Sequence, residues 1–323
     1  MTNFFKLLLL GTFIASCPLV MGNVKGLTYA QKDYNYTIGD KTIQLNYVWT
    51  NFGNKLNAIS FIINKLDVAN SYIDFKRPKN EDAYKYIYSS LLYDINIINT
   101  GQNNFVIKLL QESDDNDFKF LIKGTISNDD MKRVQEALNR QQDKYLKEYF
   151  YKYYYMWNDN NELISIDYTR VTNDYIKKMQ PIASAFKDKN KNNLYDIRIV
   201  INDILNFYQS IPYDTLLEDR GAGFSTPFRL LHEDKGDCDT KLVAVAATVR
   251  SIYPNLKTIA IVLPEHVVIG FEVPFTDEDK KVNYKGKTYV LSETAGPGIA
   301  PIGVIAESSE ALMRTGKYSI INL

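Results

Sequence analysis

The chain contains two cysteines, and one of them, Cys238, stands where a helix is expected to begin. A short turn, Gly236-Asp237, leads into it, and the alanine-rich apolar run 241–250 follows with helical spacing. Backbone N–H groups in the first turn of a helix have no partner within the helix, and the helix dipole places positive charge there. This position favours the thiolate, which is the nucleophilic form of cysteine.

A histidine and a carboxylate follow this cysteine at the ends of two predicted strands. His266 opens the apolar segment 267–271, and Glu293 lies at the end of the segment 288–294. A lone cysteine is commonly a small buried apolar residue, and a lone histidine is commonly packing or surface. Taken together, the three residues predict a triad in which Cys238 attacks, His266 transfers the proton and Glu293 orients the imidazole.

The segments that carry these residues resemble the bacterial transglutaminase-like superfamily, which shares its fold logic with papain. The resemblance rests on five segments: Phe-Tyr-Gln-Ser-Ile-Pro-Tyr at 207–213, Ser-Thr-Pro at 225–227, Gly-Asp-Cys-Asp at 236–239, Pro-x-His-x-x-x-Gly at 264–270 and Tyr-Val-Leu-x-Glu-Thr-x-Gly-Pro-Gly at 289–298. It covers the chain from about Tyr168 onwards and implies helices packed on an antiparallel sheet, with no cofactor. The family acid is more often aspartate, so Glu293 departs from the pattern.

The resemblance also suggests how the acyl intermediate is stabilised. The backbone N–H of Cys238 is the expected oxyanion donor, and Gln209, in the segment before the nucleophile, is the candidate for a second donor. The expected substrate is a protein or peptide, and the intermediate is a thioester on Cys238.

The acceptor of the acyl group decides the reaction, and the motif leaves it open. Water gives a peptidase or amidase, whereas an amine gives a transglutaminase. We expect hydrolysis of a peptide or isopeptide bond, because amine transfer requires a site that excludes water. A third alternative is a catalytically idle scaffold, in which the N-terminal half is an interaction domain of the cell envelope.

Residues 1–22 predict a secretory leader. The apolar run 7–14 follows Lys6 and is far shorter than the roughly 20 residues that cross a bilayer. One pattern at its end, 14–17, resembles a lipobox and predicts that Cys17 is lipidated and tethers the protein to a membrane. The other, 20–22, resembles an ordinary cleavage site. Both predict export, to the periplasm or as a membrane-anchored lipoprotein of a bacterial envelope.

Charge and polar spacing exclude two kinds of site. Lysine plus arginine and aspartate plus glutamate number 38 each and are interspersed, so the basic stripe of a nucleic-acid surface is absent from the sequence. The segment 188–199 begins like a calcium loop, but Asn193 and Ile199 replace the turn glycine and the bidentate glutamate, so no metal site is predicted. His232, in a charged segment, is predicted to be an exposed or rim residue.

The fold class predicted for the whole chain is α+β. Alternating apolar residues predict a hairpin at 34–49 and a further strand at 55–64, and helical spacing follows at 81–98. We predict three parts after the leader: a smaller α+β N-terminal module at 27–126, a linking helix and hairpin at 127–168, and a transglutaminase-like domain at 169–323.

Overall fold

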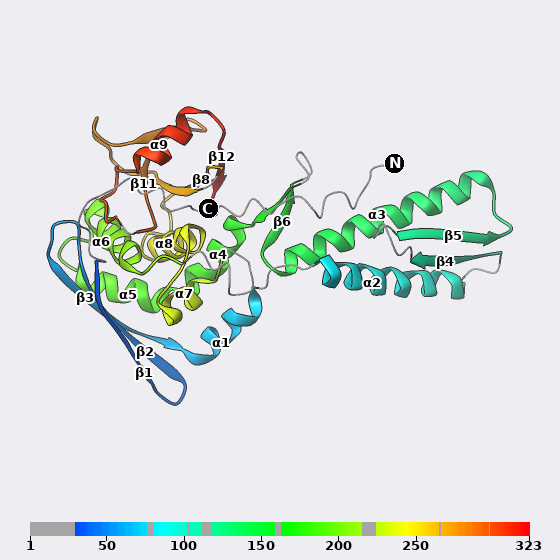
Figure 1. Ribbon diagram of the computed structural model, residues 1–323, viewed down its shortest axis with the longest axis horizontal. Coiled ribbons are helices and arrows are strands. Elements are labelled where there is room, and N and C mark those ends of the chain that lie inside the picture. Colours follow the sequence, from blue (N-terminus) through cyan, green and yellow to red (C-terminus); the bar gives the residue numbers. More distant parts are fainter. Residues whose placement is uncertain are drawn as a thin grey trace. The chain divides into compact units, whose positions relative to one another are not determined.

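A computed structural model describes residues 30–75, 80–101, 104–111, 118–158, 163–214, 224–264, 266–296 and 298–323. Over these residues the fold is α+β, with nine α-helices and antiparallel sheets, as the sequence predicts. The chain forms two compact units. One comprises Arg77–Ile166, and the other joins the N-terminal segment that ends at Lys76 to Asp167–Leu323 (Figure 1).

The second unit begins with a three-stranded antiparallel sheet in the order β1-β2-β3. Its strands are β1 (Gln31–Ile38), β2 (Thr42–Thr50) and β3 (Leu56–Asn64), followed by helix α1 (Lys65–Asp74). Apolar and polar residues alternate along β2, so that one face is buried and the other is exposed. The predicted hairpin and the predicted third strand are both confirmed.

This sheet packs on helices that follow much later in the chain. Tyr47, Trp49 and Phe61 surround the ring of Phe207, with ring centroids 4.9, 5.4 and 6.4 Å from it. The Tyr47 hydroxyl donates a hydrogen bond to the carbonyl oxygen of Leu231 at 2.5 Å. The predicted module 27–126 is therefore not one unit, because its first sheet buries its apolar face against the C-terminal half.

Six helices of the second unit come from the C-terminal half: α4 (Tyr168–Lys178), α5 (Gln180–Lys189), α6 (Ile197–Ser210), α7 (Pro227–Glu233), α8 (Cys238–Ile252) and α9 (Glu307–Arg314). Helix α8 is central. It packs against α4, α5, α6 and α7 (Figure 1), and its residues from Cys238 to Val249 are all buried. The alanines of this run allow the close approach of several neighbours.

The second sheet of this unit has five strands in the order β10-β11-β9-β8-β12. They are β8 (Thr258–Val262), β9 (Val267–Phe271), β10 (Lys281–Tyr284), β11 (Lys287–Ser292) and β12 (Ser319–Asn322), and each pairs with its neighbours in antiparallel fashion. Strand β9 contacts α8, and all five of its residues are buried. Burial on both faces explains why its sequence is a continuous apolar run.

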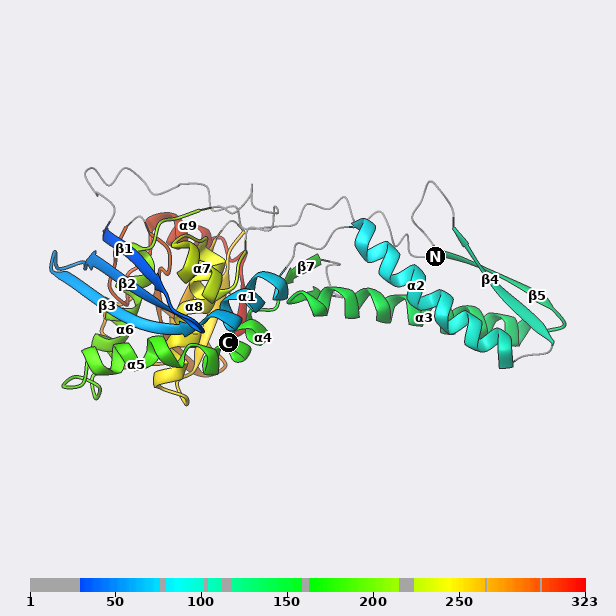
Figure 2. The same cartoon turned by 90° about the horizontal axis from the view of Figure 1, so that it is seen from below.

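The first unit contains two helices and two hairpins. Its elements are α2 (Asn80–Gly101), β4 (Phe105–Gln111), β5 (Phe118–Gly124), α3 (Asn128–Lys152), β6 (Tyr155–Asn158) and β7 (Leu163–Ile166). Helices α2 and α3 and the hairpin of β4 and β5 form this unit (Figure 2). Ile95, Ile107 and Leu138 form a small buried core between α2, β4 and α3. Ser127 caps α3 by accepting a hydrogen bond from the N–H of Asp130 at 3.1 Å. Within the described residues, no helix combines the length and apolar character that a membrane span requires.

Candidate active site

Cys238 is the first residue of α8, as predicted. Asp237 precedes it in extended conformation, and its Oδ1 accepts a hydrogen bond from the N–H of Thr240 at 2.9 Å, which caps the helix. Cys238 is not part of a disulfide, and its side chain is completely buried. The residue therefore lies at the positive end of the helix dipole and away from solvent.

His266 and Glu293 are brought into direct contact. His266 lies directly before β9 and Glu293 directly after β11, and these strands are antiparallel neighbours, with Ser292 opposite Ile269. The start of one strand and the end of the other therefore share an edge of the sheet. His266 Nε2 lies 2.5 Å from Glu293 Oε2. With the carboxylate ionised, the Nε2–H donates this bond, and Nδ1 is the ring nitrogen that takes no part in it.

The Glu293 carboxylate is held from its other side by α9. Its Oε1 accepts hydrogen bonds from the N–H of Ala306 at 3.0 Å and from the Ser309 hydroxyl at 2.7 Å. Burial alone raises the pKa of Glu293, but His266 and these hydrogen bonds outweigh burial, so the pKa lies below its usual value. The carboxylate is therefore ionised at neutral pH. Ser309 was not among the predicted site residues, although an acidic and serine-rich helix start at 307–310 was a signal for it.

Cys238 is tied to the same edge of the sheet. The hydroxyl of Thr294, the residue after the acid, donates to the carbonyl oxygen of Cys238 at 3.4 Å. Helix α8 also packs against β9, which His266 precedes. The structure therefore brings the start of α8 next to the residue that follows Glu293, and Glu293 contacts His266.

Gln209 does not have the predicted geometry of an oxyanion donor. Its Nε2 donates to two carbonyl oxygens, those of Glu293 at 2.8 Å and Ala300 at 3.1 Å, so both amide hydrogens are used. Its Oε1 accepts from the N–H of Ala300 at 3.0 Å. The amide fastens the loop that follows the acid, and the oxyanion assignment is corrected accordingly.

His232 is also placed differently from the prediction. It lies in α7 and is partly buried, and its Nδ1 is 2.9 Å from the Tyr72 hydroxyl. Its ring also contacts that of Tyr36, at a centroid distance of 5.7 Å. His232 therefore helps to join α7 to the N-terminal elements.

Two further sequence predictions concern ligand or lipid sites. The segment between α5 and α6 forms turns, closed by Asn193 N–H to Asn190 O at 2.7 Å and by Asp196 N–H to Asn193 O at 2.9 Å. No group of three or more metal-ligating side chains gathers in the described parts of the chain. The predicted leader and Cys17 lie outside the described residues.

Several buried ionisable residues surround the first turn of α8. The Tyr168 hydroxyl donates to Asp239 Oδ1, and both side chains are buried. Burial, with a contribution from Asp239, raises the pKa of Asp237 well above its usual value. Lys241 has no exposed surface, its Nζ donates to the carbonyl oxygen of Ile211 at 2.5 Å, and burial lowers its pKa to about 7. Lys241 was not predicted to be a buried charged residue, because it lies one turn after Cys238 in a segment that reads as apolar.

The buried lysine predicts a specific dependence of stability on pH. Between about pH 7 and its usual pKa of 10.5, the unfolded chain holds a proton on Lys241 that the folded chain lacks, so the free energy of unfolding rises with pH. Relative to that of Lys241→Met, the free energy of unfolding of the wild type should rise by on the order of 1 kcal/mol for each pH unit between pH 7 and 9. Urea unfolding of both proteins at three pH values measures this. If the free energies of unfolding of the two proteins change equally with pH, the prediction is contradicted.

Ser309→Ala should test the α9 contact. Loss of the hydroxyl donor raises the pKa of Glu293, so the acid limb of the pH profile of the proposed activity should move to higher pH, with turnover lowered by roughly fivefold for about 1 kcal/mol of lost stabilisation. Thr315→Val, which removes a hydroxyl bonded to Leu312 O at the other end of α9, is the matched control and should leave the limb in place. If the acid limb of the pH profile does not move in Ser309→Ala, Ser309 does not support the Glu293 carboxylate in the proposed site.

Comparisons with protein-family models, with curated proteins and with solved structures find no match to this chain.

Proposed function

We propose that the protein is a cysteine hydrolase that acts on peptide or isopeptide bonds through a thioester on Cys238. The observation that carries the proposal is the contact of 2.5 Å between His266 Nε2 and Glu293 Oε2, at the edge of the sheet that also contacts the first residue of α8. A carboxylate on Nε2 fixes the tautomer and leaves Nδ1 to receive a proton, which is the geometry that a histidine base requires.

In the proposed mechanism, His266 Nδ1 takes the proton of the Cys238 thiol, and the ionised Glu293 stabilises the imidazolium. The thiolate attacks the acyl carbon, and the backbone N–H of Cys238 stabilises the oxyanion at the start of α8. The intermediate collapses as His266 returns the proton to the leaving amine, which leaves a thioester. Water then attacks the thioester and gives its proton to His266, and the acid product and the thiol are released.

The fold is consistent with this proposal. A central helix that begins with the nucleophile, packed on an antiparallel sheet whose neighbouring strands supply the base and the acid, is the arrangement implied by the resemblance to transglutaminase-like proteins. We propose this relationship for the second unit. We also propose export by the leader at 1–22, to the periplasm or as a lipoprotein tethered through Cys17, with a protein or peptide of the envelope as substrate.

Amine transfer is the second candidate, and the burial of Cys238 favours it. The thiol is fully buried and the His266 side chain is 12% exposed. A site that excludes water protects a thioester from hydrolysis and allows an amine to compete.

One incubation distinguishes the candidates. The purified protein is mixed with a peptide library and an excess of a labelled primary amine, and the peptides and the intact protein are analysed by mass spectrometry. Shortened or deamidated peptides, with an acyl adduct on Cys238, would support hydrolysis. Labelled peptides would support amine transfer. The absence of both products and of any adduct would contradict the proposal and leave the scaffold alternative.

A further inference from the structure

We propose that Gln209 is a positioning residue of the site. Its side-chain hydrogen bonds hold the loop that follows Glu293 against α6 and thereby keep the Glu293 carboxylate in contact with His266. We call these contacts of Gln209 with Glu293 and Ala300 the clasp. This inference rests on the proposed function. Gln209 lies in the last turn of α6 and is 2% exposed. It bonds to the first residue of the loop, through Glu293 O, and to both polar backbone atoms of Ala300 near the loop's end.

The backbone of the loop touches the backbone of α6 at the same residue. A Cβ atom added to Gly296 would lie 2.3 Å from the carbonyl oxygen of Gln209. Because backbone atoms on both sides of this contact have little freedom to shift, the position requires glycine. The clasp therefore combines three hydrogen bonds with a close backbone approach.

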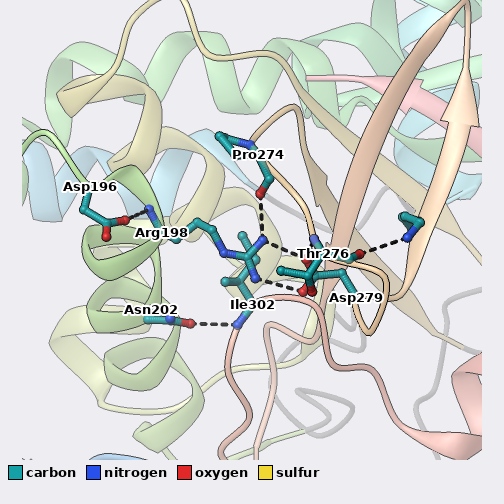
Figure 3. A network of polar contacts seen from close by, with 8 residues as sticks. Asp196, Arg198, Asn202, Pro274, Thr276, Asp279 and Ile302 are labelled. Carbon is teal, nitrogen blue, oxygen red and sulfur yellow. Dashed lines mark hydrogen bonds and ion pairs between the residues drawn. The ribbon is translucent and has the colours of Figure 1, made fainter.

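Two more side chains on the same face of α6 extend the clasp. Asn202 Oδ1 accepts from the N–H of Ile302 at 2.7 Å, and Arg198 donates to both carboxylate oxygens of Asp279 at 2.8 and 3.0 Å (Figure 3). Residues 198, 202 and 209 are separated by four and seven positions, which places them on one side of a helix. Figure 3 shows the first two pointing from the helix towards the segments that they bind.

The Asp279 end of this network is also closely packed against the loop. Gly303 has φ +92, and a Cβ atom there would lie 1.9 Å from Asp279 Oδ1. The N–H of Lys280 donates to Gly303 O at 2.8 Å, and the N–H of Gly303 donates to Leu291 O at 2.9 Å. The described part of the loop is therefore held at Glu293, Ala300 and Ile302 by α6, and at Gly303 by Lys280 and Leu291.

The placement explains why the acid needs such support. Glu293 follows the last residue of β11, beyond the Ser292–Ile269 pair at which the ladder with β9 ends. Its backbone carbonyl is held by Gln209, and its carboxylate is held by α9. Loss of the Gln209 bonds would release the backbone while leaving the carboxylate partners in place, so the contact between Glu293 and His266 would lengthen.

The test measures the thiolate of Cys238 by its ultraviolet absorbance as a function of pH, with Cys238→Ala as the blank for each protein. This readout does not require a reagent to reach the buried sulfur. In the wild type, we expect the thiolate to persist well below the ordinary thiol midpoint of about 8.5. In Gln209→Leu, the imidazolium is less well supported, and the midpoint should rise by about one pH unit.

Two further variants make the result specific. Gln209→Glu keeps the acceptor for Ala300 N–H but cannot donate when ionised, so it should show the same rise even if the leucine variant does not fold. Gln180→Leu is the matched control, because Gln180 is a partly buried glutamine of α5 whose amide donates to Ser251, and its midpoint should stay that of the wild type. A role in stability alone would lower the melting temperature without moving the midpoint.

The outcomes separate this inference from the proposed function. A low midpoint in the wild type that is unchanged in Gln209→Leu and Gln209→Glu would overturn the clasp and leave the proposed function standing. An ordinary thiol midpoint in the wild type would overturn the proposed function, and the clasp with it.

Discussion

Cys238→Ala should abolish the acyl adduct and lower turnover by roughly 10⁴–10⁶-fold, because the proposed thioester forms on this sulfur. The fold should survive. The side chain is small and completely buried, so its loss should cost about 1 kcal/mol of unfolding free energy. Intact-mass analysis after incubation with peptide, together with urea unfolding, measures both effects.

The chain offers its own control for this experiment. Cys17→Ala, in the purified protein, removes the other cysteine and should leave the adduct and the turnover unchanged. An adduct that persists in Cys238→Ala would place the nucleophile elsewhere. A variant that no longer folds would show that the cysteine is needed for packing.

Glu293→Gln should lower turnover by roughly 10²–10⁴-fold with little change in structure. The amide keeps an oxygen for Ala306 N–H and Ser309, but its NH₂ group then faces His266 and donates to Nε2. The histidine proton is thereby moved to Nδ1, the nitrogen that accepts the proton of Cys238 in the proposed mechanism. Steady-state rates on the best peptide from the library measure the loss.

A glutamate of α9, the helix that bonds to the Glu293 carboxylate, provides the comparison. Glu310→Gln removes a carboxylate that pairs with Lys280 and Arg314 at the surface, and it should leave turnover unchanged. Equal rates for Glu293→Gln and the wild type would remove the acid from the triad.

Local patterns in the sequence were sufficient for the elements that carry the site. The strand after His266 was visible because both faces of β9 are buried and its residues are uniformly apolar. The start of α8 was visible because a cap and a turn precede an alanine-rich run. These signals come from residues that are neighbours in sequence, so they predict where each helix or strand begins and which residue stands at its start. The catalytic roles themselves stay predictions.

Contacts between residues far apart in sequence could not be predicted from the same local patterns. Gln209 was assigned to the oxyanion because it precedes the nucleophile, whereas its partner Ala300 lies 91 residues away in sequence. The first sheet was assigned to an N-terminal module because its aromatic residues give no sign that Phe207 is their partner. Lys241 was read as part of an apolar helix, since nothing local shows that its ammonium group reaches Ile211 O.

The packing of β2 against the C-terminal helices has a consequence for the order in which the protein assembles. The hydrogen bond from Tyr47 to Leu231 spans 184 residues, and the whole first unit lies between the two ends of that contact in sequence. During synthesis, the first sheet is made long before its partner helices α6 and α7. The apolar face of β2 therefore stays exposed until those helices have been made. Glu293 follows later still, so a chain synthesised only as far as α8 has no acid to set beside His266, and the proposed triad can form only after β11 has been made.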